Sequence, residues 1–346
     1  MESSVVVDRF GLSADVGEWL EEAERLPAPG RPLCVPVGDE AARVLDLFAL
    51  EGRDREEVEA LWPGDAGGGR GGSPGAWSAE LWHVVECMYR RLWADAELPV
   101  GRFRWWPSLV DVSDVRLRVA SLWAFAAMVA VQLEVQGRWG VPRSVTVGTL
   151  ADVGAQVRRS RVMWGWLSLE TSGWVALQFR GGLFRVGGLQ LEPARLVSES
   201  GVEWYGEAEA AGLGEGMGVG GPVLRLHIPT GGLDPAGVDE SLGRARAFAR
   251  GCLGFDPVVA TCTSWLLDPQ WGEVLGEGSN IVAFQRRFTL VGEGRAGESD
   301  VFRFVFGSPV VDVERVPRGT RLERAVVDRL VAGGRWWVRT GWVRLS

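Results

Sequence analysis

Two neighbouring features between residues 223 and 237 could take part in chemistry. Residues 223–228 alternate like a strand, with three apolar side chains on one face and Arg225 and His227 on the other. His227 therefore ends this strand on its more polar face, and open α/β sheets bind ligands at such carboxyl ends. Because imidazole titrates near neutral pH, His227 could take a proton from an attacking nucleophile as a general base. A structural histidine bonded to loop backbone is the alternative.

The second feature is the loop that follows, Thr230-Gly231-Gly232-Leu233, which leads into Asp234-Pro235. Aspartate followed by proline is typical of a helix start, and backbone amides beside the two glycines could bind a phosphate there. Asp234 places a negative charge at this point, which arginines of the following helix, Arg244 among them, could compensate. A tight turn before a solvated arginine face is the alternative interpretation.

Cys262 and Ser264 share one face of the next predicted strand and could each be a nucleophile. The chain has no G-x-S-x-G motif, and no acid stands out that would complete a triad with His227. We therefore interpret both as small packed residues.

Composition limits the classes of partner and site. Of 346 residues, 37 are basic and 45 acidic, and the net charge of −8 argues against a general nucleic-acid binder. The longest apolar run, 119–133, is too short to span a bilayer, so we expect no membrane insertion. The four cysteines contain no C-x-x-C pair, which predicts neither a metal site nor a disulfide framework and indicates a reducing, cytoplasmic environment.

The first half of the chain has the patterning of helices. Apolar residues at helical spacing predict helices over 14–26, 40–61, 78–93, 113–136 and 149–158. The glycine-rich composition of 63–75 predicts a flexible loop between two of them.

From residue 175 the pattern changes. Short apolar runs separated by glycine pairs predict strands at 175–180, 183–186 and 189–192. Further strands are predicted at 223–228, 257–267, 289–293 and 301–306, with helices at 235–250, 279–288 and 320–332. These patterns predict an α+β protein with a helical domain over 1–174 and a second domain over 175–346.

Several strings resemble a known family. They are HIPTGGL (227–233), CTSWLLDP (262–269), SNIVAFQRRF (279–288), LERAVVDRLVAGGRWW (322–337) and LQLEP (189–193). With the helical half, they are similar to a bacterial family of two-domain acyltransferases, over most of residues 80–340. That family joins a helical N-terminal acyltransferase domain to a GNAT-like C-terminal domain. The resemblance implies a GNAT-like mixed β-sheet flanked by helices after the helical domain.

The resemblance also implies an activity. Acyl-CoA, or another acyl thioester, would be a co-substrate rather than a permanent cofactor, and its acyl group would pass by direct attack to an amine-type small-molecule acceptor. His227 or Glu192 would serve as base, without a metal ion and without a covalent intermediate on Cys262 or Ser264. The acyl carrier would bind at the strand end and loop, through Ile228, Pro229, Thr230, Gly231, Gly232 and Leu233, with Arg244.

The sequence departs from the superfamily at two points. PTGGLD stands where the R/Q-x-x-G-x-G/A phosphate signature is found, and Arg286 and Arg287 stand near the position of a tyrosine that often serves as general acid. A catalytically inactive GNAT-like protein that binds a ligand or regulates is therefore the alternative to an enzyme. A helical interaction module built on the N-terminal half is a third hypothesis. The sequence does not specify an oligomeric state.

Overall fold

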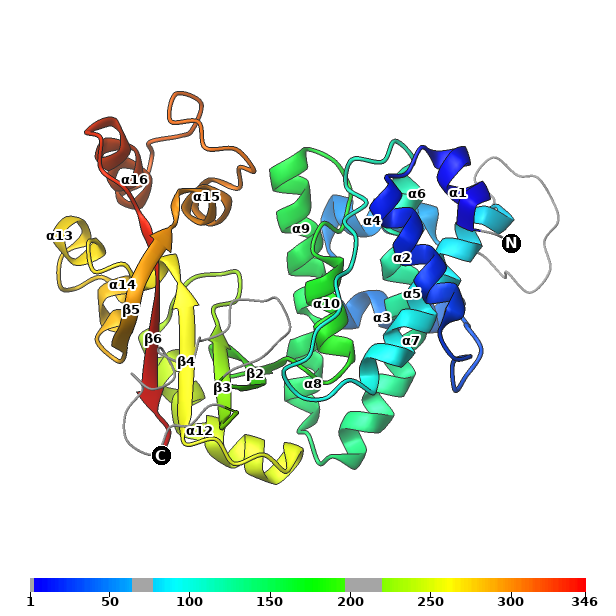
Figure 1. Ribbon diagram of the computed structural model, residues 1–346, viewed down its shortest axis with the longest axis horizontal. Helices are drawn as coiled ribbons and strands as arrows, with labels where there is room; N and C mark the ends of the chain where they lie inside the picture. The colour runs from blue at the N-terminus through cyan, green and yellow to red at the C-terminus, as the bar shows by residue number, and fades with distance from the viewer. Residues whose placement is uncertain (1–2, 64–76, 197–219) are drawn as a thin grey trace. The chain divides into compact units, whose positions relative to one another are not determined.

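The computed structural model describes residues 3–63, 77–196 and 220–346. The chain divides into two compact units (Figure 1): Met1–Pro99 with Phe103–Leu183, and Val100–Arg102 with Phe184–Ser346. The loop predicted at 63–75 lies outside the described residues, except for Pro63.

The described part of the N-terminal unit is helical, as predicted, but the segments predicted as single helices over 40–61 and 113–136 each form two helices. Its elements are α1 (Ser3–Phe10), α2 (Ala14–Arg25), α3 (Gly38–Leu47), α4 (Gly52–Leu61), α5 (Ala79–Ala96), α6 (Val115–Arg118), α7 (Ala120–Arg138), α8 (Arg143–Leu150), α9 (Asp152–Trp164) and α10 (Ser172–Phe179). Ser13 and Ser78 cap α2 and α5, each accepting a hydrogen bond from a backbone amide of the first turn.

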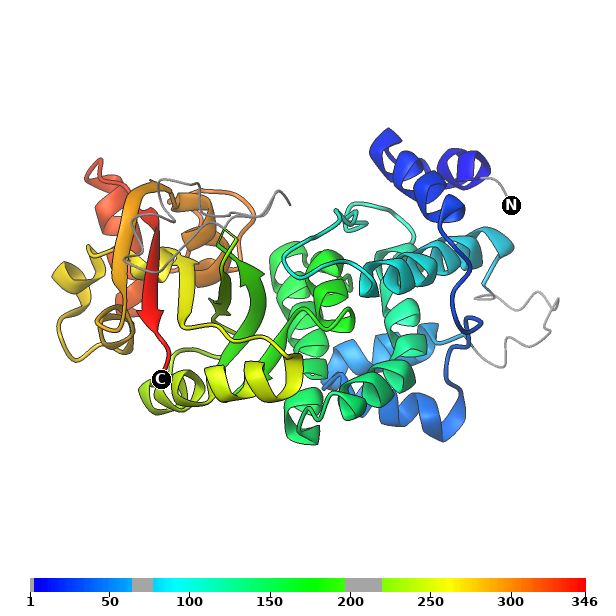
Figure 2. The same cartoon turned by 60° about the horizontal axis from the view of Figure 1, so that its bottom comes forward.

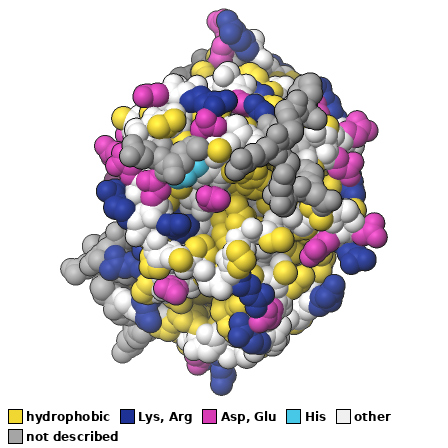
Figure 3. All heavy atoms as spheres, turned by 90° about the vertical axis from the view of Figure 1, so that its right-hand side faces the viewer, with side chains coloured by type: hydrophobic (Ala, Val, Ile, Leu, Met, Phe, Trp, Pro, Cys, Tyr) yellow, Lys and Arg dark blue, Asp and Glu magenta, His cyan; other side chains and the backbone are white. Residues whose placement is uncertain are grey.

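Helix α7 is the centre of this unit. Its Trp123 and Phe125 are fully buried, and the rings of Trp62 and Trp77 lie edge-on to Trp123, with centroids 4.8 and 5.5 Å away. Such aromatic packing buries a large apolar area and stabilises the helical core. Figure 3 views the molecule from the side on which this unit lies in Figure 1, and it shows both acidic and basic side chains beside hydrophobic ones on that face.

The strand predicted at 175–180 is wrong, because these residues belong to α10. Residues 175–179 are all buried, and a short apolar run that is buried all round cannot be assigned to helix or strand by its periodicity. The Gly181-Gly182 pair follows this helix instead of turning a hairpin, and Gly181 has a φ of +72°.

The C-terminal unit contains a six-stranded mixed sheet in the order β1-β2-β3-β4-β6-β5, which confirms the α+β class. The strands are β1 (Phe184–Val186), β2 (Leu189–Arg195), β3 (Pro222–His227), β4 (Val259–Ser264), β5 (Thr289–Ala296) and β6 (Trp337–Arg344). The predicted glycine-pair hairpin is confirmed at Gly187-Gly188, where Val186 pairs with Leu189. All neighbours are antiparallel except β3 and β4, which are parallel.

Helices flank this sheet (Figure 2). They are α12 (Pro235–Leu253), the 3-10 turn η1 (Trp265–Leu267), α13 (Trp271–Leu275), α14 (Asn280–Gln285), α15 (Glu298–Val301), the π-helical turn η2 (Phe302–Phe306) and α16 (Arg321–Val331). Helix α12 packs closely on the β1–β2 hairpin, where the Gly188 amide donates to the Gly237 carbonyl at 3.1 Å. A Cβ on Gly188 would lie 2.8 Å from the Gly237 backbone, so this approach requires glycine.

The strand predicted at 301–306 is also wrong, because α15 and η2 occupy this segment. Val301 and Phe302 are both fully buried, whereas a strand would place adjacent side chains on opposite faces. The tail from Trp337 instead forms β6, between β4 and β5. None of the helices in the described ranges combines the length and the hydropathy that a bilayer span requires.

Candidate functional site

The parallel strands β3 and β4 pair over only a short stretch. Their register consists of Leu224 with Ala260 and Arg225 with Thr261. The antiparallel ladder between β2 and β3, in contrast, continues to the pair formed by Gln190 and His227. The two parallel strands therefore part before β3 ends, and His227 lies beyond the point where they separate.

His227 and Glu192, both predicted as site residues, lie together. Nε2 of His227 is 2.7 Å from Oε2 of Glu192, and Nη1 of Arg225 is 3.4 Å from the same oxygen. Glu192 and Arg225 are a directly opposed pair of the β2–β3 ladder, and His227 is two residues further along the same face of β3. Strand register thus brings the three side chains together.

The burial of this cluster differs between its members. The side chains of Glu192 and Arg225 are 8% and 9% exposed, and that of His227 is 23% exposed. An ionised carboxylate can only accept hydrogen bonds, so beside an ionised Glu192 the neutral imidazole of His227 carries its proton on Nε2 and its lone pair on Nδ1. The contact with Glu192 holds the imidazole in one orientation at the end of a strand.

The loop from Ile228 to Leu233 connects β3 to α12, as predicted. Gly231 and Gly232 have φ values of +122° and +93°, which only glycine adopts readily. The Leu233 carbonyl accepts a hydrogen bond of 2.8 Å from Nδ2 of Asn280, which ties the loop to α14.

Asp234 caps α12 and thereby uses two of its first amides. Its carboxylate accepts from the amides of Ala236 at 3.4 Å and Gly237 at 2.9 Å. An anion at this helix end would compete with the Asp234 carboxylate for those donors. The loop amides before Asp234 are therefore better placed for a phosphate than the first turn of α12.

Arg244 is not brought to this loop. It lies nine residues after Pro235, about 14 Å along the helix axis, and its Nη1 pairs with Glu240 at 2.5 Å. The arginine near the start of α12 is Arg287 of the segment after α14. Its Nη2 donates to the Pro235 carbonyl at 3.3 Å, and its Nε donates to Asp239 at 2.6 Å. The hydrogen bonds with Asp239 raise the pKa of Arg287.

Sequence reasoning missed the position of Arg287, which is 48 residues from Asp239. No local pattern relates the two residues, because their contact depends on the packing of α14 against α12. Only the tertiary structure identifies Arg287 as a cation of this region.

The environments of Cys262 and Ser264 indicate structural roles for both residues. Cys262 is buried, and burial raises the pKa of its thiol to about 12, with Arg225 acting in the opposite direction. Oγ of Ser264 accepts a hydrogen bond of 3.1 Å from the Leu266 amide and caps η1. Neither side chain has the activation that a nucleophile requires.

Two family models match the chain in succession. The N-acyltransferase N-terminal domain matches residues 39–181, and the GNAT-like C-terminal domain matches residues 183–343. No curated protein matches the chain.

Solved structures of acyltransferases match the whole chain. An acyltransferase in complex with decanoyl-CoA is 30% identical with a TM-score of 0.80. An acyltransferase in complex with decanoyl-CoA and teicoplanin, and an acyltransferase mutant in complex with octanoyl-CoA, are each 28% identical with a TM-score of 0.83. Each match covers 100% of both chains.

Proposed function

Because the chain belongs to the family of two-domain acyltransferases that joins an N-acyltransferase N-terminal domain to a GNAT-like C-terminal domain, we propose that it moves an acyl group from acyl-CoA to an amine-type acceptor by direct attack. The observation that carries this proposal is the contact of His227 with Glu192 at the end of β3, beyond the point where β3 and β4 part. The sequence left open which of these two residues is the base. Burial favours His227, because Glu192 is the less exposed partner and also faces Arg225.

In the proposed reaction, the acceptor amine attacks the thioester carbonyl, a C–N bond forms and the C–S bond breaks. Nδ1 of His227 takes the proton that the amine loses, and the Glu192 carboxylate stabilises the resulting imidazolium. The CoA thiolate then takes a proton. A thiol has a pKa of about 8.5, so a thiolate can leave without a strong general acid. This explains how the reaction would proceed although Arg286 and Arg287 stand near the usual tyrosine position.

The proposed carrier site consists of Ile228, Pro229, Thr230, Gly231, Gly232 and Leu233. Asp234 already occupies amides of α12, so the pyrophosphate would bind mainly to the loop amides. Arg287 replaces Arg244 as the cation that we expect near the carrier, because it contacts the first turn of α12.

We further propose a medium-chain acyl-CoA as donor and a small molecule with an amine as acceptor. Support comes from the similar acyltransferases, which were crystallised with octanoyl-CoA or decanoyl-CoA, and in one case also with teicoplanin. The four free cysteines fit a cytoplasmic enzyme, since reduced thiols persist in that compartment.

The test combines binding with turnover. Calorimetry with octanoyl-CoA and decanoyl-CoA measures binding, and release of free CoA with teicoplanin and a panel of amines measures transfer. We expect binding of an acyl-CoA and CoA release that depends on the amine. If no acyl-CoA binds, the proposal is wrong. Binding without transfer to any amine, unaffected by His227→Ala, would instead favour the ligand-binding alternative.

A further inference from the structure

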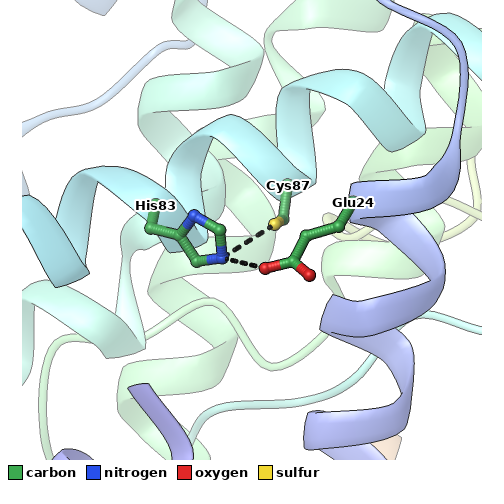
Figure 4. A group of neighbouring side chains, drawn as sticks. All are labelled: Glu24, His83 and Cys87. Atoms are coloured by element: carbon green, nitrogen blue, oxygen red, sulfur yellow. Dashed lines mark hydrogen bonds and ion pairs between the residues drawn. The ribbon is translucent and has the colours of Figure 1, made fainter. Parts of the chain in front are cut away.

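A second cluster of reactive side chains lies in the N-terminal unit, between α2 and α5. Figure 4 shows Glu24 of α2 pointing toward His83 and Cys87 of α5. Oε1 of Glu24 is 2.7 Å from Nε2 of His83, and Sγ of Cys87 is 3.7 Å from the same nitrogen. His83 and Cys87 are four residues apart, so α5 presents both on one face. All three ligand atoms lie within 4.8 Å of one another.

The cluster is largely closed to solvent. Cys87 is 3% exposed, His83 8% and the adjoining Ser3 2%. Oγ of Ser3 donates to Oε1 of Glu24 at 2.8 Å and lies 3.5 Å from Nε2 of His83. A carboxylate, an imidazole, a thiol and a hydroxyl therefore converge in one buried place. A hydrogen bond that only joined the two helices would need the carboxylate and the imidazole, but it would not need the thiol.

We propose that Glu24, His83 and Cys87 bind a zinc ion. Thiolate, imidazole and carboxylate are the ligands that zinc prefers, and a tetrahedral ion with ordinary bond lengths holds its sulfur and nitrogen ligands about 3.6 Å apart. The observed separation of 3.7 Å between Sγ and Nε2 matches this value. To replace its hydrogen bond with a metal bond, the Glu24 oxygen must move about 0.7 Å further from Nε2 and come to about 3.5 Å from Sγ. The three ligand atoms already lie within 4.8 Å of one another, and the Glu24 side chain is 30% exposed and able to make this movement.

Charge and protons also balance in this site. Without an ion, the buried thiol of Cys87 keeps its proton beside the Glu24 carboxylate. Zinc binding replaces the thiol proton, which leaves to solvent, and thiolate and carboxylate together neutralise the ion. The imidazole binds through Nε2 with its proton on Nδ1, and water or the Ser3 hydroxyl takes the fourth position.

The proposed ion would fasten the first helices to the rest of the N-terminal unit. Glu24 precedes residues 39–181, which match the N-acyltransferase domain, whereas His83 and Cys87 lie within them. The Glu24 carbonyl already accepts a hydrogen bond of 2.5 Å from Nη1 of Arg90 on α5. The role is therefore structural, and its test does not depend on acyl transfer.

The experiment uses the full chain after dialysis against a chelator. Zinc is titrated against a chromophoric competitor, and zinc content is measured by mass spectrometry. We expect one zinc per chain with a dissociation constant below about a micromolar, and a rise in Tm of about 5 °C at saturating zinc. Cobalt in place of zinc should produce a thiolate-to-cobalt charge-transfer band. Substoichiometric binding, or a cobalt complex without that band, would overturn the proposal.

Variants assign the site. Cys87→Ser and Glu24→Gln keep the size of each side chain and should lower zinc affinity at least about tenfold, as expected when a ligand is lost. Cys34→Ser removes an exposed thiol and should bind zinc like the unchanged protein. Equal affinity of Cys87→Ser and the unchanged protein, or loss of binding in Cys34→Ser, would place the metal elsewhere. If Cys87→Ser does not fold, the cobalt band of the unchanged chain still shows whether a thiolate binds the metal.

Discussion

The two histidines of this chain form the same contact in opposite settings. In each unit, Nε2 of a histidine lies 2.7 Å from a glutamate oxygen. In the N-terminal unit, the His83 side chain is 10% exposed and that of Glu24 30%. In the C-terminal unit the order is reversed, with His227 at 23% and Glu192 at 8%. In each pair, the more exposed side chain is the one that can contact a ligand from solvent.

This reversal separates the two proposed roles. His227 is held by a buried carboxylate and can pass a proton to or from a ligand. His83 is held inside the helical unit, and the movable Glu24 carboxylate can turn from the imidazole to an ion shared with Cys87. The same pair of residue types therefore suits a base in one unit and a metal ligand in the other.

The largest expected effect is on catalysis. His227→Ala should lower kcat by about 10²–10⁴-fold, the usual contribution of a general base, while the thermal unfolding of the protein changes little. Steady-state release of CoA measures this effect. The matched variant, His83→Ala, should lower Tm and zinc affinity and leave kcat within about threefold of the unchanged protein, since its role is structural. Equal loss of activity in both variants would contradict the assignment of a catalytic role to His227 and a structural role to His83.

Glu192→Gln should affect both activity and stability. The amide keeps the shape of the side chain but replaces the charged partner of Arg225 with a neutral one, which should lower the free energy of unfolding by about 1–3 kcal/mol. We expect kcat to fall about 10-fold or more, because the amide cannot stabilise the imidazolium. Urea denaturation and steady-state kinetics measure the two effects. An unchanged free energy of unfolding would show that the contact between Arg225 and Glu192 does not stabilise the fold.

The buried thiols predict a loss of stability in alkali. Burial raises the pKa of Cys87 and of Cys262 to about 12, against about 8.5–9 in an unfolded chain. The folded state holds the proton more tightly, so the stability that it contributes is complete below pH about 9 and is lost as the pH rises toward 12. Each thiol should lower the free energy of unfolding by about 1.4 kcal/mol per pH unit in this window.

Denaturation of the metal-free chain at pH 8 and pH 10.5 measures this dependence. Cys87→Ala should remove the contribution of the N-terminal thiol, and Cys262→Ala that of the C-terminal one. The exposed thiol of Cys34 serves as control, and its replacement should leave the pH dependence unchanged. A dependence that survives both alanine variants would have to come from other groups.

The smallest expected effect distinguishes two arginines of the C-terminal unit. Arg287→Ala should raise the KM for acyl-CoA about three- to tenfold, because it removes a cation beside the first turn of α12. Arg244→Ala should change this KM less than about twofold, since a surface ion pair along a helix contributes little. Initial rates at varied acyl-CoA concentration decide between them. A larger rise in KM for Arg244→Ala than for Arg287→Ala would instead support Arg244, the arginine predicted from the sequence.

Local signals predicted much of the C-terminal unit. Asp234-Pro235 located the start of α12, the Gly187-Gly188 pair located the β1–β2 turn, and alternation placed His227 at the end of β3. The segments 175–180 and 301–306 were predicted wrongly, because short apolar runs suit a buried helix as well as a strand. Such runs acquire their conformation from packing rather than from their own pattern.

The sequence by itself determined the family, the α+β class and the position of His227, since each of these is read from short local patterns along the chain. The tertiary structure decided which groups meet. Strand register brings Glu192 to His227 across 35 residues, and the packing of α2 on α5 brings Glu24 to His83 and Cys87. A sequence pattern specifies the face on which a side chain lies, but contacts between elements depend on burial and register over the whole fold.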